Sequence, residues 1–137
     1  MNLWEDKKMR LYRMKSVYAL IAIASLLLIP VAVKAQAVKT TVATILANPD
    51  QYDGKMVEVA GQSTAIKSKT SRKGNPYTTF KVTDNGNTLS VFSFGTLPIK
   101  DGDSVRVRGR YQKVKHVPPS FTFYNEIDAS EGGVEKR

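Results

Sequence analysis

The sequence has no cysteine, and it has one tryptophan and one histidine among 137 residues. Without cysteine, disulfides, thiolate metal sites, cysteine nucleophiles and lipid attachment to a cysteine are excluded. The single histidine, His116, has no second histidine and no acidic cluster beside it, which disfavours a metal or haem site. We find no nucleophile–base pair, phosphate-binding glycine loop or shielded carboxylate pair. The sequence therefore predicts a protein that is not an enzyme, with no catalytic residue, metal or cofactor.

Acidic residues are scarce near the N-terminus, where basic residues precede an uncharged apolar run. Residues 1–15 carry five Lys or Arg side chains, and residues 16–33 carry no charge. Small residues at Val33, Ala35 and Ala37 suit cleavage after Ala35 or Ala37. This pattern predicts a signal peptide over residues 1–37 and an exported protein, periplasmic or secreted. The alternative is that residues 16–33 are retained as a membrane anchor. The apolar run has 18 residues, which is the lower limit for a helix that spans a membrane.

Export changes the charge of the functional part. Met14 followed by Lys15 would be a natural start, so residues 1–13 are expected to be an upstream start or a dispensable extension. Residues 1–37 contain six of the 21 Lys and Arg and two of the 12 acidic residues, which leaves 15 minus 10, or +5, in place of +9. A moderate positive charge suits nucleic acid, an anionic glycan or a membrane surface, and it also suits solubility alone.

A short helix followed by five strands is expected in the remaining chain. Val42, Ile45 and Leu46 form one apolar face of a helix that ends before Pro49, and we expect it to cover an open end of a sheet. Alternating apolar residues then predict strands over 55–67, 77–83, 88–94, 104–114 and 121–129. The expected core residues on these strands are Val57, Val59, Ala65, Phe80, Val82, Leu89, Val91, Val105, Val107, Phe123 and Ile127. Residues 131–137 are expected to be a frayed polar tail.

Glycines mark where these strands turn or bend. Residues 54–61 and 102–109 share the pattern G-x-x-V-x-V-x-G, in which two valines pack inward and the last glycine allows a sharp bend. Asn85-Gly86 suits a type I′ hairpin turn. Five strands with two bent ones favour a small closed antiparallel barrel, because closure removes the sheet edges.

This pattern resembles the OB-fold, and in particular the nucleic-acid-binding OB modules of the anticodon-binding and helicase type. The resemblance covers residues 42–129 and is carried by residues 45–49, 52–61, 76–84, 89–92 and 102–109. It implies an all-β, five-stranded Greek-key barrel with a short leader helix, spanning residues 38–130. It also implies a ligand that lies across the second and third strands, between the loops at 69–76 and 113–120.

The loop from Lys67 to Pro76 is the strongest candidate for a polyanion site. Lys67, Lys69, Arg72 and Lys73 crowd into seven positions before Gly74, and aromatic residues follow. Lys and Arg in such a loop would contact phosphates, and Tyr77 and Phe92 would stack on bases. Phe92 is opposite in parity to Leu89 and Val91, so we expect it to point away from the core. The predicted ligand-binding residues are Lys69, Arg72, Lys73, Tyr77, Lys81, Phe92, Arg110, Lys113 and Lys115.

Single-stranded nucleic acid, or another flexible polyanion, is thus the first predicted partner. The basic loop is equally well explained as a solvated loop that aids solubility. The stripe of Arg106, Arg108 and Arg110 is read, for at least the first two, as an outward face that discourages edge pairing. An envelope domain that binds a protein or a glycan is the second hypothesis, and a haem or metal carrier through His116 is the weakest.

Overall fold

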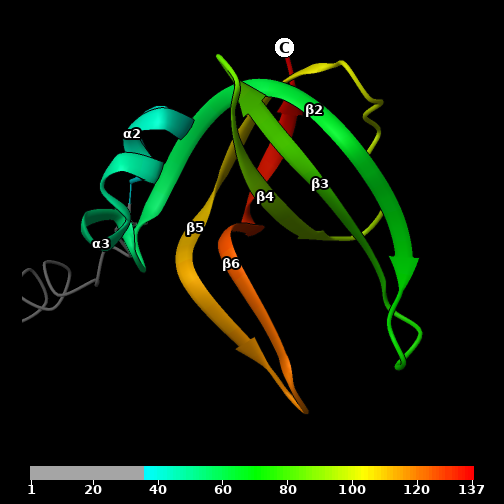
Figure 1. Ribbon diagram of the computed structural model, residues 1–137. Helices are drawn as coiled ribbons and strands as arrows, with labels where there is room; N and C mark the ends of the chain where they lie inside the picture. Colours follow the sequence, from blue (N-terminus) through cyan, green and yellow to red (C-terminus); the bar gives the residue numbers. More distant parts are fainter. Residues whose placement is uncertain (1–35) are drawn as a thin grey trace, which may run out of the picture. The chain divides into compact units, whose positions relative to one another are not determined.

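The structure, a computed structural model, describes residues 36–137, and the predicted signal peptide lies almost wholly outside these residues. Among the described residues, no helix is long and apolar enough to cross a membrane. The elements in chain order are β1 (Val38–Lys39), α2 (Val42–Ala47), α3 (Pro49–Tyr52), β2 (Met56–Thr70), β3 (Pro76–Asp84), β4 (Asn87–Phe94), β5 (Ser104–Val117) and β6 (Phe121–Lys136) (Figure 1).

Strands β2 to β6 form one curved sheet that closes on itself. Its order is β2-β3-β4-β6-β5, and β5 returns to pair with β2. All these pairings are antiparallel except β4 with β6, which is parallel. This closed five-strand order, with its Greek-key connection, is the OB-fold that the sequence predicted. The two-residue strand β1 adds to β2 in parallel at Val38 and Lys39.

The leader helix covers the barrel core as predicted. Thr41 begins α2 by accepting a hydrogen bond from the Thr44 amide at 3.1 Å, and Asn48-Pro49 ends it. Val42 and Ile45 are fully buried in the same cluster as the barrel valines. Burial of two aliphatic side chains of this size stabilises the fold by about 1.5–3 kcal/mol each.

The two G-x-x-V-x-V-x-G segments form the bends that the barrel needs. Strand β2 pairs with β5 over residues 56–62 and with β3 over residues 62–70, so Gly61 lies at the change of partner. A Cβ atom at Gly61 would lie 2.5 Å from the Thr83 carbonyl oxygen, and one at Gly109 would overlap the Asp128 carbonyl. Only glycine permits these close backbone approaches.

The Asn85-Gly86 turn is also confirmed. Asn85 has φ 48° and Gly86 has φ 79°, which are the two left-handed positions of a type I′ turn between β3 and β4.

Three sequence expectations were wrong. Ala65 is exposed and has φ 53°, because the β2–β3 register shifts between Thr64 and Lys67. Phe123 is not a core residue, since 44% of it is exposed. The polar segment 131–137 is not a frayed tail: β6 runs to Lys136 and pairs with the first residues of β5.

The error at Phe123 has a local cause. Asn125 lies between Phe123 and Ile127 with φ 51°, and its left-handed conformation interrupts the alternation of the strand. Beyond this point the strand is regular: Glu126 pairs with Ser90 and Ile127 pairs with Val91, so these two consecutive residues lie on opposite faces of the sheet. The buried Tyr111 hydroxyl donates a hydrogen bond to Asn125 Oδ1 at 2.5 Å and holds this irregular point in place.

Candidate nucleic-acid interface

The outer face of the β2–β3–β4 sheet carries matched rows of side chains. Residues that pair directly across strands point to the same face. Lys69 pairs with Tyr77, which pairs with Phe94, and this forms one row. In the next row, Lys67 pairs with Thr79, which pairs with Phe92. Each row thus runs from a cation on β2 to an aromatic ring on β4.

Three aromatic rings from these rows contact one another. The centroids of Tyr77 and Phe92 are 5.6 Å apart, and those of Phe92 and Phe94 are 5.1 Å apart in an edge-to-face arrangement. Both distances lie in the favourable range for aromatic pairs. Phe94 is nevertheless 63% exposed, so this patch is open to solvent.

The hairpin of β5 and β6 forms the opposite wall. It extends beyond the closed part of the barrel and ends at Pro118-Pro119-Ser120. Val117 pairs with Phe121 and Lys115 pairs with Phe123, and all four side chains line the groove between the two hairpins. The groove encloses about 660 Å³ and is bounded by Lys69, Tyr77, Thr79, Phe92, Phe94, Lys115, Val117, Phe121, Phe123, Glu126 and Asp128.

A small charged cluster lies within this aromatic groove. Lys115 Nζ lies 2.9 Å from Glu126 Oε1 and 3.7 Å from Asp128 Oδ2. The same ammonium group lies 4.6 Å from the centre of the Phe92 ring, a cation–π contact. Two carboxylates therefore hold Lys115 on the floor, and it does not reach out to solvent as a phosphate ligand would.

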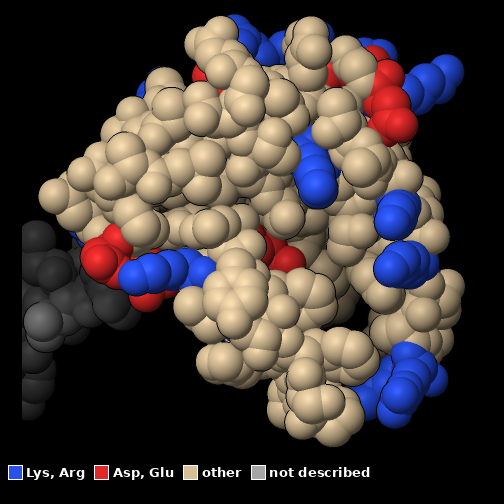
Figure 2. Space-filling view, in the orientation of Figure 1, with Lys and Arg blue, Asp and Glu red and all other residues tan. Residues whose placement is uncertain are grey.

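The cations of the basic loop, unlike Lys115, stand on the rim of the groove. Arg72 and Lys73 lie at the tip between β2 and β3, in a turn closed by hydrogen bonds between Ser71 and Asn75. Neither they nor Lys67 and Lys69 form an ion pair with an acidic side chain within residues 36–137. Figure 2 shows Lys and Arg lined up along the β2–β3 side of the hollow, with acidic atoms deeper inside and an uncharged wall opposite.

The structure brings together four of the nine predicted ligand-binding residues: Lys69, Tyr77, Phe92 and Lys115. Arg72 and Lys73 stand at the tip of one wall, as described above. Lys81 is on the same outer face, one row beyond Thr79, where it pairs with Thr64 and Ser90.

Arg110 and Lys113 lie outside the groove. Arg110 donates a hydrogen bond to the Gly54 carbonyl at 2.7 Å and pairs with Glu131 at 3.7 Å. Lys113 pairs with Asp50 of α3 at 2.8 Å, and this hydrogen bond raises the pKa of Lys113. Both side chains are thus turned to partners distant in sequence, and they do not border the groove.

The other two arginines of the stripe have structural partners as well. Arg108 donates to the buried Glu58 carboxylate at 3.0 Å, and Arg106 lies 3.6 Å from Glu135 on β6. The stripe is therefore neutralised by acidic residues of its own sheet and offers no continuous track for a polyanion.

Sequence reasoning missed several groove residues. Phe94 has the parity of Phe92, so the same argument would have found it. Phe121 and Phe123 required knowledge of the irregularity at Asn125. No sequence signal placed Glu126 and Asp128 beside Lys115, because that contact lies within the β5–β6 hairpin across the left-handed residue Asn125.

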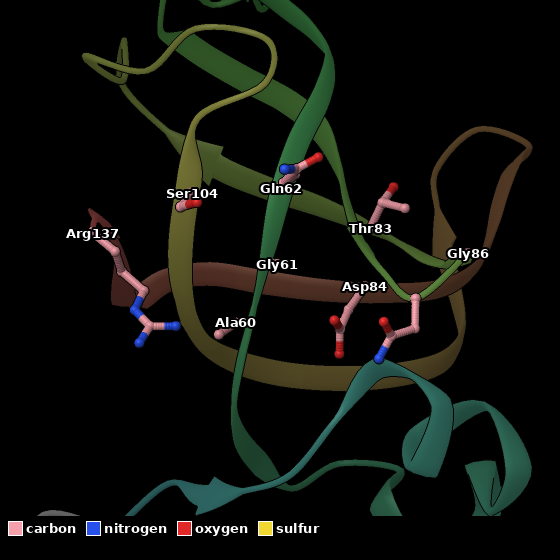
Figure 3. Close-up of a pocket in the computed structure, with 9 residues that line it drawn as sticks. Ala60, Gly61, Gln62, Thr83, Asp84, Gly86, Ser104 and Arg137 are labelled. Atoms are coloured by element: carbon pink, nitrogen blue, oxygen red, sulfur yellow. The ribbon is translucent and has the colours of Figure 1, made fainter.

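A second hollow lies on another part of the barrel, near the turn between β3 and β4. It encloses about 490 Å³ and is lined by backbone and small polar side chains, with Asp84 and Arg137 at opposite sides (Figure 3). It contains no aromatic residue. The aromatic groove is therefore the better candidate site.

The described residues contain no group of side chains around His116 that would bind a metal ion. His116 is exposed on β5, where its Nδ1 lies 3.1 Å from Thr122 Oγ1. Within residues 36–137, no group of three or more His, Cys, Asp or Glu side chains is arranged to hold a metal ion.

Comparison with known proteins identifies the fold of this chain but not its function. No family model matches the sequence, and no curated protein matches it. The crystal structure of yeast Stn1 and Ten1 matches with a TM-score of 0.54 and 12% identity, over 76% of this chain and 64% of that one. A Leishmania major protein described as an aspartyl-tRNA synthetase matches with a TM-score of 0.52 and 13% identity, over 79% of this chain and 22% of that one. The chain thus spans less than two thirds of either protein. Together with the strand order, these similarities show that residues 36–137 form an OB-fold module.

Proposed function

We propose that this domain binds single-stranded nucleic acid in the groove between the β2–β3 and β5–β6 hairpins. Bases lie against the aromatic rings of the groove, and phosphates follow Lys67, Lys69, Arg72 and Lys73 along its rim. The domain acts as a binding module without catalysis. We also propose that it works after export, on the basis of the basic and apolar pattern in residues 1–37.

The observation that carries this proposal is the exposure of aromatic rings on facing walls. Phe94 is 63% exposed and Phe121 is 56% exposed, on opposite sides of one groove. Large apolar side chains gathered at an open groove are uncommon in a soluble domain unless they bind something. Flat rings accept any base by stacking, and each such contact contributes about 1–3 kcal/mol.

The distribution of charge supports a polyanion over an uncharged ligand. The four rim cations project from one wall without acidic partners among the described residues, whereas the arginines on the far strands are paired. A strand whose bases enter the groove would place its phosphates beside this wall. The resemblance to a protein described as a tRNA synthetase agrees with this proposal, although at 13% identity it establishes only the fold.

Fluorescence anisotropy with a labelled single-stranded oligonucleotide tests the proposal. The purified protein should bind at low salt, and Phe92→Ala should weaken binding by about 1–3 kcal/mol. Tyr124→Ala is the matched control, because Tyr124 is 66% exposed but does not line the groove. Excess heparin as competitor separates nucleic-acid recognition from general polyanion binding. Absence of binding at low salt would refute the proposal.

A second candidate function, capture of a protein partner, is favoured by the other side of the β5–β6 hairpin. Val114 and Tyr124 pair across the strands, and both are exposed although they lie outside the groove. Capture of a protein that survives high salt, is lost with Tyr124→Ala and is kept with Phe92→Ala would support this function.

A further inference from the structure

The floor of the groove has a charge pattern that a simple phosphate-binding surface does not need. Two carboxylates, Glu126 and Asp128, lie beneath the aromatic rings, beside the single ammonium group of Lys115. A phosphate would be repelled from this floor. The edge of a base suits this floor better than the phosphate backbone does.

Glu126 is the best-placed of these groups to recognise a ligand. Its side chain is only 8% exposed, and yet it lines the groove. Within residues 36–137, its one side-chain hydrogen bond is the one that Oε1 accepts from Lys115. A carboxylate has about four acceptor positions, so most of the capacity of Glu126 is unused.

Asp128 adds further acceptor capacity on the same floor. Its Oδ1 accepts a hydrogen bond from the Ser130 amide at 3.1 Å, and its Oδ2 faces Lys115. The floor thus combines carboxylate acceptors with one neighbouring donor, Lys115, which Glu126 and Asp128 hold in place.

This arrangement distinguishes the bases by their hydrogen-bonding edges. Cytosine and adenine each present an exocyclic amino donor beside a ring-nitrogen acceptor, which matches a carboxylate beside an ammonium group. Uracil and thymine present one ring N–H between two carbonyl acceptors. A carboxylate can accept from this N–H and Lys115 can donate to one carbonyl, but the other carbonyl then lies against the carboxylate oxygens of the floor, which repel it. Acidic side chains are known to accept from the cytosine amino group.

We propose that Glu126, supported by Lys115 and Asp128, makes the groove prefer bases with an exocyclic amino group over thymine and uracil. This inference rests on the proposed function and adds the base preference of the same site. A good base-edge contact gives discrimination on the order of tenfold.

The test measures binding of labelled oligo-dC, oligo-dA and oligo-dT of equal length to the full chain by fluorescence anisotropy, at one salt concentration. The wild-type protein should bind oligo-dC and oligo-dA about tenfold more tightly than oligo-dT. Glu126→Gln keeps the size of the side chain but adds an amide donor that suits a thymine carbonyl. The ratio of the affinities for oligo-dC and oligo-dT should therefore fall in this variant.

The ratio is the useful quantity because removal of a negative charge strengthens binding of every oligonucleotide. Lys55→Ala is the control: it changes one charge away from the groove and should leave the ratio unchanged. If Glu126→Gln does not fold, Asp128→Asn is the replacement variant, and the ratio should fall in it for the same reason. Equal or tighter binding of oligo-dT by the wild-type protein would overturn the inference while the proposed function stands. An unchanged ratio in Glu126→Gln would do the same. Failure of all three oligonucleotides to bind would overturn both proposals.

Discussion

The salt dependence of binding gives the sharpest test of how the rim of the groove works. Four cations without described acidic partners, Lys67, Lys69, Arg72 and Lys73, border the path proposed for the phosphates. Each phosphate contact to a single strand adds about −0.7 to the slope of log K against log salt concentration. Four contacts therefore predict a slope of about −2.8, which is about a 50-fold loss of affinity between about 50 and about 200 mM salt.

The double substitution Arg72→Ala and Lys73→Ala removes two of these contacts. The slope should fall to about −1.4, and the loss of affinity over the same salt range to about sevenfold. Lys55→Ala with Lys100→Ala is the matched control, because it removes two exposed cations that do not line the groove. Anisotropy titrations at three or more salt concentrations measure both slopes. An unchanged slope in the Arg72 and Lys73 variant, or an equal change in the control, would refute the proposed phosphate path.

Further predictions concern the barrel and the residues outside the groove. Lys113→Ala should leave both affinity and slope unchanged in the same titrations, because Lys113 is paired with Asp50 away from the groove. Gly109→Ala should lower the free energy of unfolding in urea by about 1–3 kcal/mol or more, since the added Cβ overlaps the Asp128 backbone, whereas Ser104→Ala at an exposed site should not. The pKa of Asp103 is lowered below 3.8, chiefly by the hydrogen bond from the Lys100 amide. Its contribution to stability is thus fully present above pH 3.8 and is lost as pH falls through the lower, folded value, so Asp103→Ala should destabilise at neutral pH and match the wild type in strong acid.

The parts of the fold that follow local rules could be predicted from the sequence. Glycine and valine spacing located the bent strands, and Asn85-Gly86 located the hairpin, because each depends on a few neighbouring residues. Parity alone placed Phe92 outside the core, and it lines the groove.

The parts that failed depend on contacts distant in sequence. The charge partners of Arg110 and Lys113 are Glu131 on β6 and Asp50 on α3, and both contacts depend on how β5 packs against these other elements. Glu131-Gly132-Gly133 is a poor strand sequence, yet it belongs to β6 because β5 offers a paired edge. At the end of the chain, pairing with β5 therefore outweighs the low strand propensity of the glycine-rich segment.

The left-handed residues Ala65 and Asn125 have a consequence for the size of the ligand. Each lies near the point where a hairpin leaves the closed barrel, with φ 53° on β2 and φ 51° on β6. A non-glycine residue in this conformation costs on the order of 1–3 kcal/mol, so the surrounding structure holds both in place. Both walls of the groove therefore leave the closed barrel at a left-handed backbone position outside the core. We expect a glycine at either position, which relieves this backbone strain, to make the corresponding hairpin more mobile and the groove more tolerant of ligands of different thickness.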